Sequence, residues 1–165
     1  MEIERKYLIR HLPENLEQYP CKVIEQAYLC ADPIVRIRKS NDRYILTYKS
    51  KYGLAETDCT ARINREIEAD LSEGGYYHLR EKADGYYVTK RRYIIPLEGG
   101  LKAELDVFEG RLKGLIFVEV EFPDEQASER FKAPEWFGED VSQDNRYSNQ
   151  YLSTLESLEQ METGR

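Results

Sequence analysis

The sequence has few of the residues on which zinc-binding and disulfide-stabilised proteins depend. It contains two histidines and three cysteines among 165 residues. Cys21, Cys30 and Cys59 form no Cys-x-x-Cys pair, and we expect ordinary reduced thiols in a reducing compartment. A zinc site built on histidine is therefore poorly supported. If the protein binds a metal ion, carboxylates must hold it, which favours hard cations such as Mg²⁺ or Mn²⁺.

Long apolar runs are also missing. No stretch approaches the ~20 apolar residues that a helix needs to cross a membrane. The chain opens with MEIERKYLIR, in which charges begin at the second residue, whereas a secretory signal has an apolar core. We therefore expect a cytoplasmic protein with no membrane partner.

An excess of basic residues is missing too. The chain has 31 acidic and 24 basic residues, a formal net charge of -7. Proteins that bind a nucleic acid duplex usually gather a basic excess on one face, so we expect no nucleic acid partner. A net acidic protein can still bind a small anion where its bases converge and metal ions offset its acids.

The dominant pattern that is present is alternation with period two, which is typical of β-strands. It runs through eight segments: 1–9, 23–30, 34–39, 44–51, 60–71, 86–96, 101–109 and 115–123. Short turn sequences such as Asn41-Asp42 separate them. Eight antiparallel strands suffice to close a small barrel. We predict a single domain over residues 1–165, mainly β (α+β) in class, built as a closed eight-stranded antiparallel β-barrel with a few peripheral helices.

Three segments are predicted as helices, at 72–83, 125–131 and 148–161. The last places Tyr151, Leu152, Leu155 and Leu158 on one face. We expect this C-terminal helix to pack on the apolar exterior of the barrel.

Charged residues two positions apart share one face of a strand. Such sets occur at Glu2/Glu4/Lys6, Arg36/Arg38, Lys49/Lys51, Glu66/Glu68, Lys90/Arg92, Glu104/Asp106 and Glu119/Glu121. One interpretation is a solvated outer face over an apolar interior. Like charges at this spacing repel, however, unless an opposite charge lies between them, and most sets carry one sign. This sorting favours a lumen with one acidic wall and one basic wall, and an apolar exterior covered by helices, loops or another subunit.

A lumen of this kind suits an extended polyanion. Arginine offers a planar fork to phosphate oxygens and lysine a point charge. Paired carboxylates hold hard divalent ions, which bridge phosphate oxygens. Phosphoryl transfer needs this arrangement, and a metal ion can also lower the pKa of a bound water. The other polar-inside architecture, an outer-membrane barrel, is disfavoured by the charged start, the helical segments and the high charge.

The opening Glu2-Ile3-Glu4-Arg5-Lys6 resembles the Glu-x-Glu-x-Lys strand of the CYTH domain family, also called triphosphate tunnel metalloenzymes. Further motifs follow in the order of that family over nearly the whole chain. They are Arg36-Ile37-Arg38, Thr47-Tyr48-Lys49, Arg65-Glu66-Ile67-Glu68, the helix at 72–82, Lys90-Arg91-Arg92-Tyr93, the acidic strands at 104–108 and 118–122, and the tail at 144–149.

The resemblance implies an eight-stranded tunnel and metal-dependent hydrolysis of triphosphates. It implies metal-binding acids at Glu2, Glu4, Glu119 and Glu121. Glu104 and Asp106 would add to that wall or orient a water, and Glu66 and Glu68 would be metal ligands or partners of the bases. It implies phosphate-binding residues at Lys6, Arg36, Arg38, Lys49, Lys90 and Arg92, with Arg146 at the tunnel mouth. The catalytic set would be Glu2, Glu4, Lys6, Asp106, Glu119 and Glu121.

We expect inorganic tripolyphosphate as the substrate, cleaved to pyrophosphate and phosphate, because no sequence feature builds a pocket for a base or a thiazole ring. An adenylate cyclase or a thiamine triphosphatase of the same fold is the enzymatic alternative. A non-catalytic module that binds polyphosphate or phosphorylated ligands is the alternative of another class. The acidic set favours catalysis, since an anion binder gains little from carboxylates that face its ligand. We expect a monomer or a homodimer.

Overall fold

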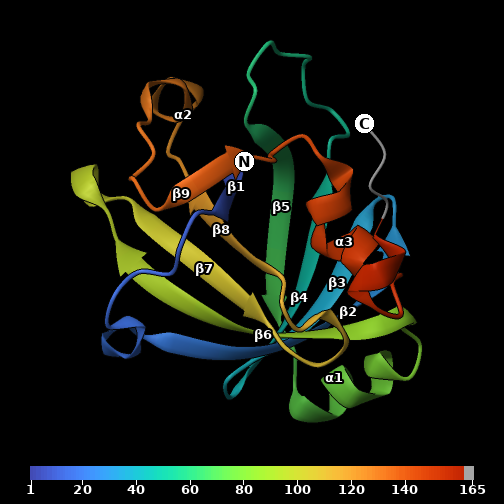
Figure 1. Cartoon of the computed structure of the whole chain (residues 1–165). Coiled ribbons are helices and arrows are strands. Elements are labelled where there is room, and N and C mark those ends of the chain that lie inside the picture. Colours follow the sequence, from blue (N-terminus) through green and yellow to red (C-terminus); the bar gives the residue numbers. More distant parts are fainter. Residues whose placement is uncertain (162–165) are drawn as a thin grey trace.

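The computed structural model describes residues 1–161, in which nine antiparallel strands form one sheet (Figure 1). The strand order is β5-β4-β3-β2-β6-β7-β8-β1-β9, and β5 also pairs with β1, which closes eight strands into a barrel. The strands are β1 (Glu2–Ile9), β2 (Cys21–Ala31), β3 (Ile34–Ser40), β4 (Arg43–Ser50), β5 (Arg62–Asp70), β6 (Asp84–Pro96), β7 (Lys102–Phe108), β8 (Ile116–Glu121) and β9 (Phe137–Asp140). The prediction of a closed eight-stranded antiparallel barrel is confirmed.

The eight predicted strands all form, because their alternation is long enough to fix both type and register. The turn at Asn41 is confirmed as well, since Asn41 has a φ of 51° and joins β3 to β4. Asn41 also pairs with β2, donating its backbone N–H to the Val23 carbonyl and accepting at Oδ1 from the Val23 N–H.

The sequence did not predict β9. This strand has four residues, including Gly138, and is too short to show alternation. It pairs with the C-terminal half of β1, while β5 pairs with the N-terminal half. A Cβ at Gly138 would lie 3.2 Å from the Leu8 carbonyl oxygen, so the close approach of the two backbones explains the glycine.

Within residues 1–161, three helices and several 3-10 turns lie around the barrel. They are α1 (Glu73–Arg80), α2 (Glu125–Arg130) and α3 (Asn149–Leu152), with 3-10 turns at Leu16–Gln18, Glu98–Gly100, Gly110–Leu112, Asn145–Tyr147 and Leu158–Gln160. The first two confirm the predicted helices. Ser72 and Asp124 cap them, because each side chain accepts a hydrogen bond from the third residue after it.

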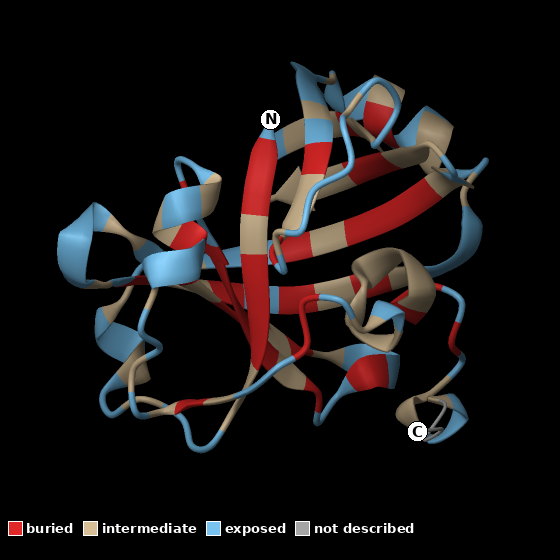
Figure 2. Cartoon of the chain, turned by 90° about the horizontal axis from the view of Figure 1, so that it is seen from above, coloured by how far each residue is buried: buried red, intermediate tan, exposed pale blue. Residues whose placement is uncertain are grey.

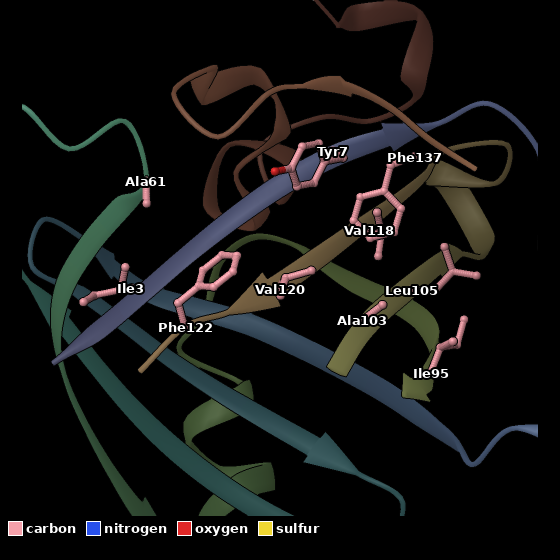
Figure 3. Close-up of a cluster of buried hydrophobic side chains, with 10 residues drawn as sticks. All are labelled: Ile3, Tyr7, Ala61, Ile95, Ala103, Leu105, Val118, Val120, Phe122 and Phe137. Atoms are coloured by element: carbon pink, nitrogen blue, oxygen red, sulfur yellow. The ribbon is translucent and has the colours of Figure 1, made fainter. Parts of the chain in front are cut away.

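Many outward side chains of the barrel are apolar and covered, although Val23 and Ile67 are exposed. Ile3, Leu105, Val118 and Val120 lie on the outer faces of β1, β7 and β8, in one buried cluster that also includes Phe137 of β9 (Figure 3). On the other side, α1 covers β2 and β3. Figure 2 shows that buried residues follow the strands, whereas exposed residues gather in the peripheral loops. This burial stabilises the fold at roughly 25 cal/mol per Å² of apolar surface, and it leaves the inward faces free to carry charge.

The lumen changes character toward one end of the barrel. Val88, Phe108 and Phe117 lie on the inward faces of β6, β7 and β8 and are buried against Leu152 and Leu155 of the tail. The C-terminal segment therefore seals this end from within, instead of covering the exterior as predicted.

The predicted helix at 148–161 is also wrong in length, because α3 ends at Leu152. The Ser153 carbonyl accepts a hydrogen bond from the Tyr86 N–H of β6 at 2.7 Å. The Ser153 and Thr154 hydroxyls bond back to carbonyls three residues earlier, each at 2.6 Å. These contacts compete with continued helix. Within residues 1–161, no helix is long and apolar enough to cross a membrane.

Candidate active site

The strand order sorts the lumen charges into two walls. The acidic pairs lie on β5, β1, β8 and β7, which follow one another around the barrel, and the bases lie on β4, β3 and β6. β4 contributes Lys49 alone, because the strand ends at Ser50 and Lys51 is exposed beyond it. The strand between β3 and β6 is β2, which adds Lys22 to the basic side. Lys6 on β1 and Arg62 on β5 are the basic members of the acidic side. The strand order thus brings the inward-facing charged residues of separate strands together in one cavity, with an acidic side and a basic side.

This cavity has a volume of about 520 Å³. Most of the charged residues predicted from the sequence line it: Glu2, Glu4, Lys6, Arg36, Arg38, Lys49, Glu66, Glu68, Arg92, Glu104, Glu119 and Glu121. These groups come from seven strands spread over most of the chain. The solvated-outer-face interpretation therefore does not describe this protein.

The carboxylates of the acidic wall repel one another. Glu4 and Glu121 lie directly opposite across β1 and β8. Burial, with Glu119 and Glu2 nearby, raises the pKa of Glu4 well above its usual range. Burial, with Glu2 and Glu104, also raises the pKa of Glu121. The acidic wall therefore carries more negative charge than its two basic residues, Lys6 and Arg62, neutralise.

Glu119 differs from its neighbours. Burial alone would raise its pKa, but Lys6 and Arg92 hold the pKa of Glu119 well below its usual range. The Glu119 Oε1 atom lies 3.6 Å from Arg92 Nη2 and 4.0 Å from Lys6 Nζ. It is buried and accepts no hydrogen bond. A buried carboxylate oxygen that is ionised and accepts no hydrogen bond can coordinate a cation.

Lys49 bridges the two walls beside β5. Its Nζ lies 3.0 Å from Glu2 Oε1 and 3.4 Å from Glu66 Oε2. Burial would lower the pKa of Lys49, but Glu4 and Glu2 raise it above its ordinary value. Lys49 is therefore a fixed positive charge at this edge of the cavity.

The basic wall presents arginines whose positions are set by neutral partners. Gln26 is fully buried, and its Oε1 accepts from Nε and Nη2 of Arg38 at 2.9 and 2.6 Å. Arg36 donates from Nη2 to the Thr47 hydroxyl at 3.1 Å, while its buried Nε has no hydrogen-bond partner. Burial, with Arg36 and Arg92 nearby, lowers the pKa of Arg38 to about 9. Guanidinium groups stay protonated at neutral pH, so this positive charge is one that an anion would offset.

Behind Arg92 lies a buried ionic network. Asp106 Oδ1 accepts from Arg92 Nε at 2.7 Å, and Asp106 Oδ2 accepts from Arg92 Nη2 at 2.9 Å and from Lys90 Nζ at 2.7 Å. The side chains of Asp106 and Lys90 are 0% exposed. Burial alone would raise the pKa of Asp106, but Arg92 and Lys90 lower it. Neither Asp106 nor Lys90 lines the cavity, which corrects the prediction that both face its contents.

Arg146 does not line the cavity either. Its guanidinium forms an ion pair with Asp144 at 2.6 Å, within the same turn of the tail. The local acid holds it there, which corrects the prediction that it reaches the tunnel mouth.

The geometry can be set beside known proteins. No protein-family model matches the chain. The chain is 39% identical over 156 residues to an inorganic triphosphatase of Nitrosomonas europaea, covering 92% of this chain and 96% of that protein. It is 36% identical over 161 residues to an inorganic triphosphatase of Acetivibrio thermocellus, covering 92% of each. The chain belongs to the CYTH-like triphosphate tunnel family.

Solved structures share the barrel. A crystal structure of an inorganic triphosphatase has a TM-score of 0.66 at 34% identity, covering 94% of this chain and 95% of that one. A putative adenylyl cyclase from Hippeastrum, described as having a dominant triphosphatase activity, has a TM-score of 0.54 at 15% identity over 78% of this chain and 83% of its own. The second likeness shows the fold alone.

The acidic wall fits the hard cation that the family resemblance implies. Its donors are all carboxylate oxygens, which suit Mg²⁺ or Mn²⁺, and their mutual repulsion is relieved by a divalent ion. In residues 1–161, no three acidic, histidine or cysteine side chains already converge on one point. Ion pairs explain why the carboxylates are spread apart. Lys49 pairs with Glu2 and Glu66, and Arg92 pairs with Glu104 at 3.2 Å.

Several lining residues were not predicted. Arg62 and Asn64 precede Glu66 and Glu68 on the same face of β5, and Lys22 and Tyr28 share the inward face of β2. The same period-two count would have found all four. The cavity is also lined by Ser148, Asn149 and Gln150. The family resemblance included the tail at 144–149, but the predicted helix over 148–161 did not show that these three side chains face the cavity.

Proposed function

We propose that this chain hydrolyses inorganic tripolyphosphate to pyrophosphate and phosphate, with Mg²⁺ or Mn²⁺ as cofactor. One observation carries the proposal: acids and bases from seven strands face each other across a single cavity. The inorganic triphosphatases at 36% and 39% identity, matched over 92% of the chain, support the substrate.

The two walls have separate roles in this proposal. Glu2, Glu4, Glu119 and Glu121 hold the metal ion, and Glu66, Glu68 and Glu104 add negative charge around it. Lys6, Arg36, Arg38, Lys49 and Arg92 bind the phosphates. Asp106 and Lys90 act from behind Arg92, because both are buried away from the cavity.

In the reaction, the oxygen of a water molecule forms a bond to a terminal phosphorus while the anhydride P–O bond breaks. The electron pair leaves on pyrophosphate, and the proton of the water passes to a lumen carboxylate. The metal ion, when bound, neutralises phosphate charge and lowers the pKa of water. The lysines and arginines orient the chain and offset the charge that develops, and positioning of this kind supplies most of the catalysis in phosphoryl transfer.

The lining favours an unsubstituted phosphate chain. Tyr28 is the one aromatic side chain among the described residues that line the cavity, and Ile24, Ile34 and Ile45 are its aliphatic ones. Most of the lining is charged, so a nucleobase or a thiazole ring would have to displace water from charged side chains to enter.

Phosphate release from tripolyphosphate, thiamine triphosphate and ATP, each with Mg²⁺, Mn²⁺ or a chelator, tests the proposal. We expect the highest kcat/KM for tripolyphosphate, one phosphate and one pyrophosphate per molecule, and no turnover with chelator. Cyclic AMP as the main product from ATP would establish a cyclase instead. Tight tripolyphosphate binding by calorimetry, with no turnover under either metal, would establish a binding module.

A further inference from the structure

The segment 144–152, called the tail segment below, touches lumen lysines from both walls. The Tyr147 carbonyl accepts from Lys6 Nζ at 2.6 Å, and Asn149 Oδ1 accepts from Lys90 Nζ at 3.0 Å. Lys6 lies on β1 and Lys90 on β6. The tail segment is thus joined to the acidic and the basic wall by separate hydrogen bonds.

Asn149 is held in place independently of its contact with Lys90. It is the first residue of α3, and the Ser148 hydroxyl caps that turn by accepting from the Tyr151 N–H at 3.1 Å. Leu152, at the end of α3, is fully buried against the apolar end of the lumen. The backbone hydrogen bond from Tyr86 to Ser153 then ties the end of the turn to β6. The backbone of Asn149 is therefore held by contacts other than its side-chain hydrogen bond to Lys90.

Asn149 is connected to Arg92 in the cavity by a series of hydrogen bonds that passes through Lys90 and Asp106. Asn149 holds Lys90, Lys90 shares the Asp106 carboxylate with Arg92, and Arg92 reaches the lumen. Lys90 and Asp106 are 0% exposed, whereas Asn149 lines the cavity, so a water that took the place of its amide would be a mobile acceptor instead of a fixed one. A buried ammonium that loses an acceptor must move to find another one, since an unmet buried donor is unfavourable. Any such movement displaces the carboxylate that fixes the Arg92 guanidinium.

We propose that Asn149 is a positioning residue for turnover, which acts through Lys90 and Asp106 to set the guanidinium of Arg92 against the phosphate chain. The inference rests on the proposed function, in which Arg92 binds phosphate. It gives the tail segment a part in the chemistry beyond sealing the barrel. It also explains why Lys90, a residue with the motif of a phosphate ligand, is buried behind the cavity.

Asn149→Ala, Asn149→Asp and Asn145→Ala test this role. Asn145 is the matched control, because it lies in the same tail segment and its Oδ1 also accepts a hydrogen bond from the barrel, from Arg62 at 2.9 Å. Arg62 lines the cavity but is not among the proposed phosphate-binding residues and, in the described part of the chain, makes no hydrogen bond or ion pair with Lys90, Asp106 or Arg92. We expect Asn149→Ala to lower kcat by about 10- to 100-fold, the range produced by small misplacements of a catalytic group, with a smaller change in KM. Asn149→Asp keeps an acceptor for Lys90 and should recover most of the kcat, and Asn145→Ala should keep the wild-type kcat.

A second variant separates positioning from general loosening of the tail. In a Lys90→Met background, Asn149→Ala should cause no further loss of kcat, because the connection is already cut. An equal loss in Asn145→Ala and Asn149→Ala, or a full additional loss in the Lys90→Met background, would overturn the inference.

A crystal structure of each single variant gives a readout that needs no turnover. We expect the Arg92 guanidinium to be displaced in Asn149→Ala and unmoved in Asn145→Ala, whereas an unmoved Arg92 in Asn149→Ala would overturn the inference. Lack of tripolyphosphate turnover by the unaltered chain would instead overturn the proposed function, and these two structures would still decide the role of Asn149.

Discussion

Several basic side chains of the lumen are held by a specific neighbour. Gln26 fixes Arg38, Asp106 fixes Arg92, and Glu2 fixes Lys49. Donors that are already oriented lose little freedom when a ligand binds, and they need no reorganisation as charge develops. Truncating one of them should therefore affect substrate binding and turnover more than folding.

Arg38→Ala tests this at the basic wall. A charge-assisted hydrogen bond contributes about 1.5–3 kcal/mol, so we expect KM for tripolyphosphate to rise by roughly 10- to 100-fold. The control is Arg91→Ala, because Arg91 is exposed and pairs with Glu109. An unchanged KM in Arg38→Ala would argue against its phosphate-binding role.

Glu119→Gln tests the acidic wall. The amide keeps the shape of the side chain but removes the charge that a cation requires. Loss of an outer partner of a metal site already costs about 10- to 100-fold, so we expect metal-dependent kcat/KM to fall by more than about 100-fold. Circular dichroism should show an intact fold, and Glu109→Gln on the exterior should retain activity. Normal turnover in Glu119→Gln would remove it from the ligand set.

At the scale of elements, the contact between the start of β6 and the tail at Ser153 determines which end of the barrel is closed. Gly85 has a φ of +66°, and a Cβ there would lie 2.5 Å from the Ser153 carbonyl oxygen. That carbonyl is the acceptor of the Tyr86 N–H. Only glycine allows the strand to approach the tail this closely.

Gly85→Ala should therefore lower the free energy of unfolding by more than the cost of placing alanine in the left-handed conformation. The left-handed conformation costs a non-glycine residue about 1–2 kcal/mol. Gly99→Ala is the matched control, since Gly99 has a φ of +73° and no atom lies within 4 Å of the place that an alanine methyl would occupy. Urea unfolding should show a larger loss of unfolding free energy in Gly85→Ala. Equal losses would mean that the contact with Ser153 contributes nothing.

The same scale shows how far the sequence predicts the structure. Period-two alternation predicted eight strands and which charges face inward, because a strand has only two faces. It could not predict that Asp106 and Lys90 would neutralise each other behind Arg92, since that depends on pairing between strands. The tail was predicted as one long helix from its leucines, yet Leu152 and Leu155 fill the end of the lumen. Apolar spacing alone does not distinguish these two ways of burying leucine.

At the scale of the whole molecule, charge is separated across one cavity, and this makes stability depend on pH and on cations. The raised pKa of Glu4 means that the folded chain retains a proton that the unfolded chain loses, so stability falls as pH rises through that window. Asp106 and Glu119 have lowered pKa values, and their contribution is present above the ordinary range of a carboxyl and is lost as pH falls below it. Repulsion in the acidic wall is therefore greatest at neutral to alkaline pH.

Mg²⁺ should raise the melting temperature more at about pH 8 than at about pH 5, because at the lower pH it must displace a proton from the acidic wall. NaCl at matched ionic strength should give a much smaller rise, and Glu119→Gln should reduce the Mg²⁺ effect. Differential scanning fluorimetry measures each quantity. A rise that is independent of pH, or equal with NaCl, would mean that the cations screen the surface and do not bind in the lumen.

The proposed hydrolysis depends most on one arrangement, in which a metal ion on the acidic wall faces phosphates on the basic wall of the same cavity. Anomalous diffraction from crystals grown with Mn²⁺ and tripolyphosphate measures this directly. We predict a manganese peak among Glu2, Glu4, Glu119 and Glu121, with phosphate density against Arg36, Arg38 and Arg92. Manganese found only on the exterior, or phosphates bound outside the barrel, would contradict the account.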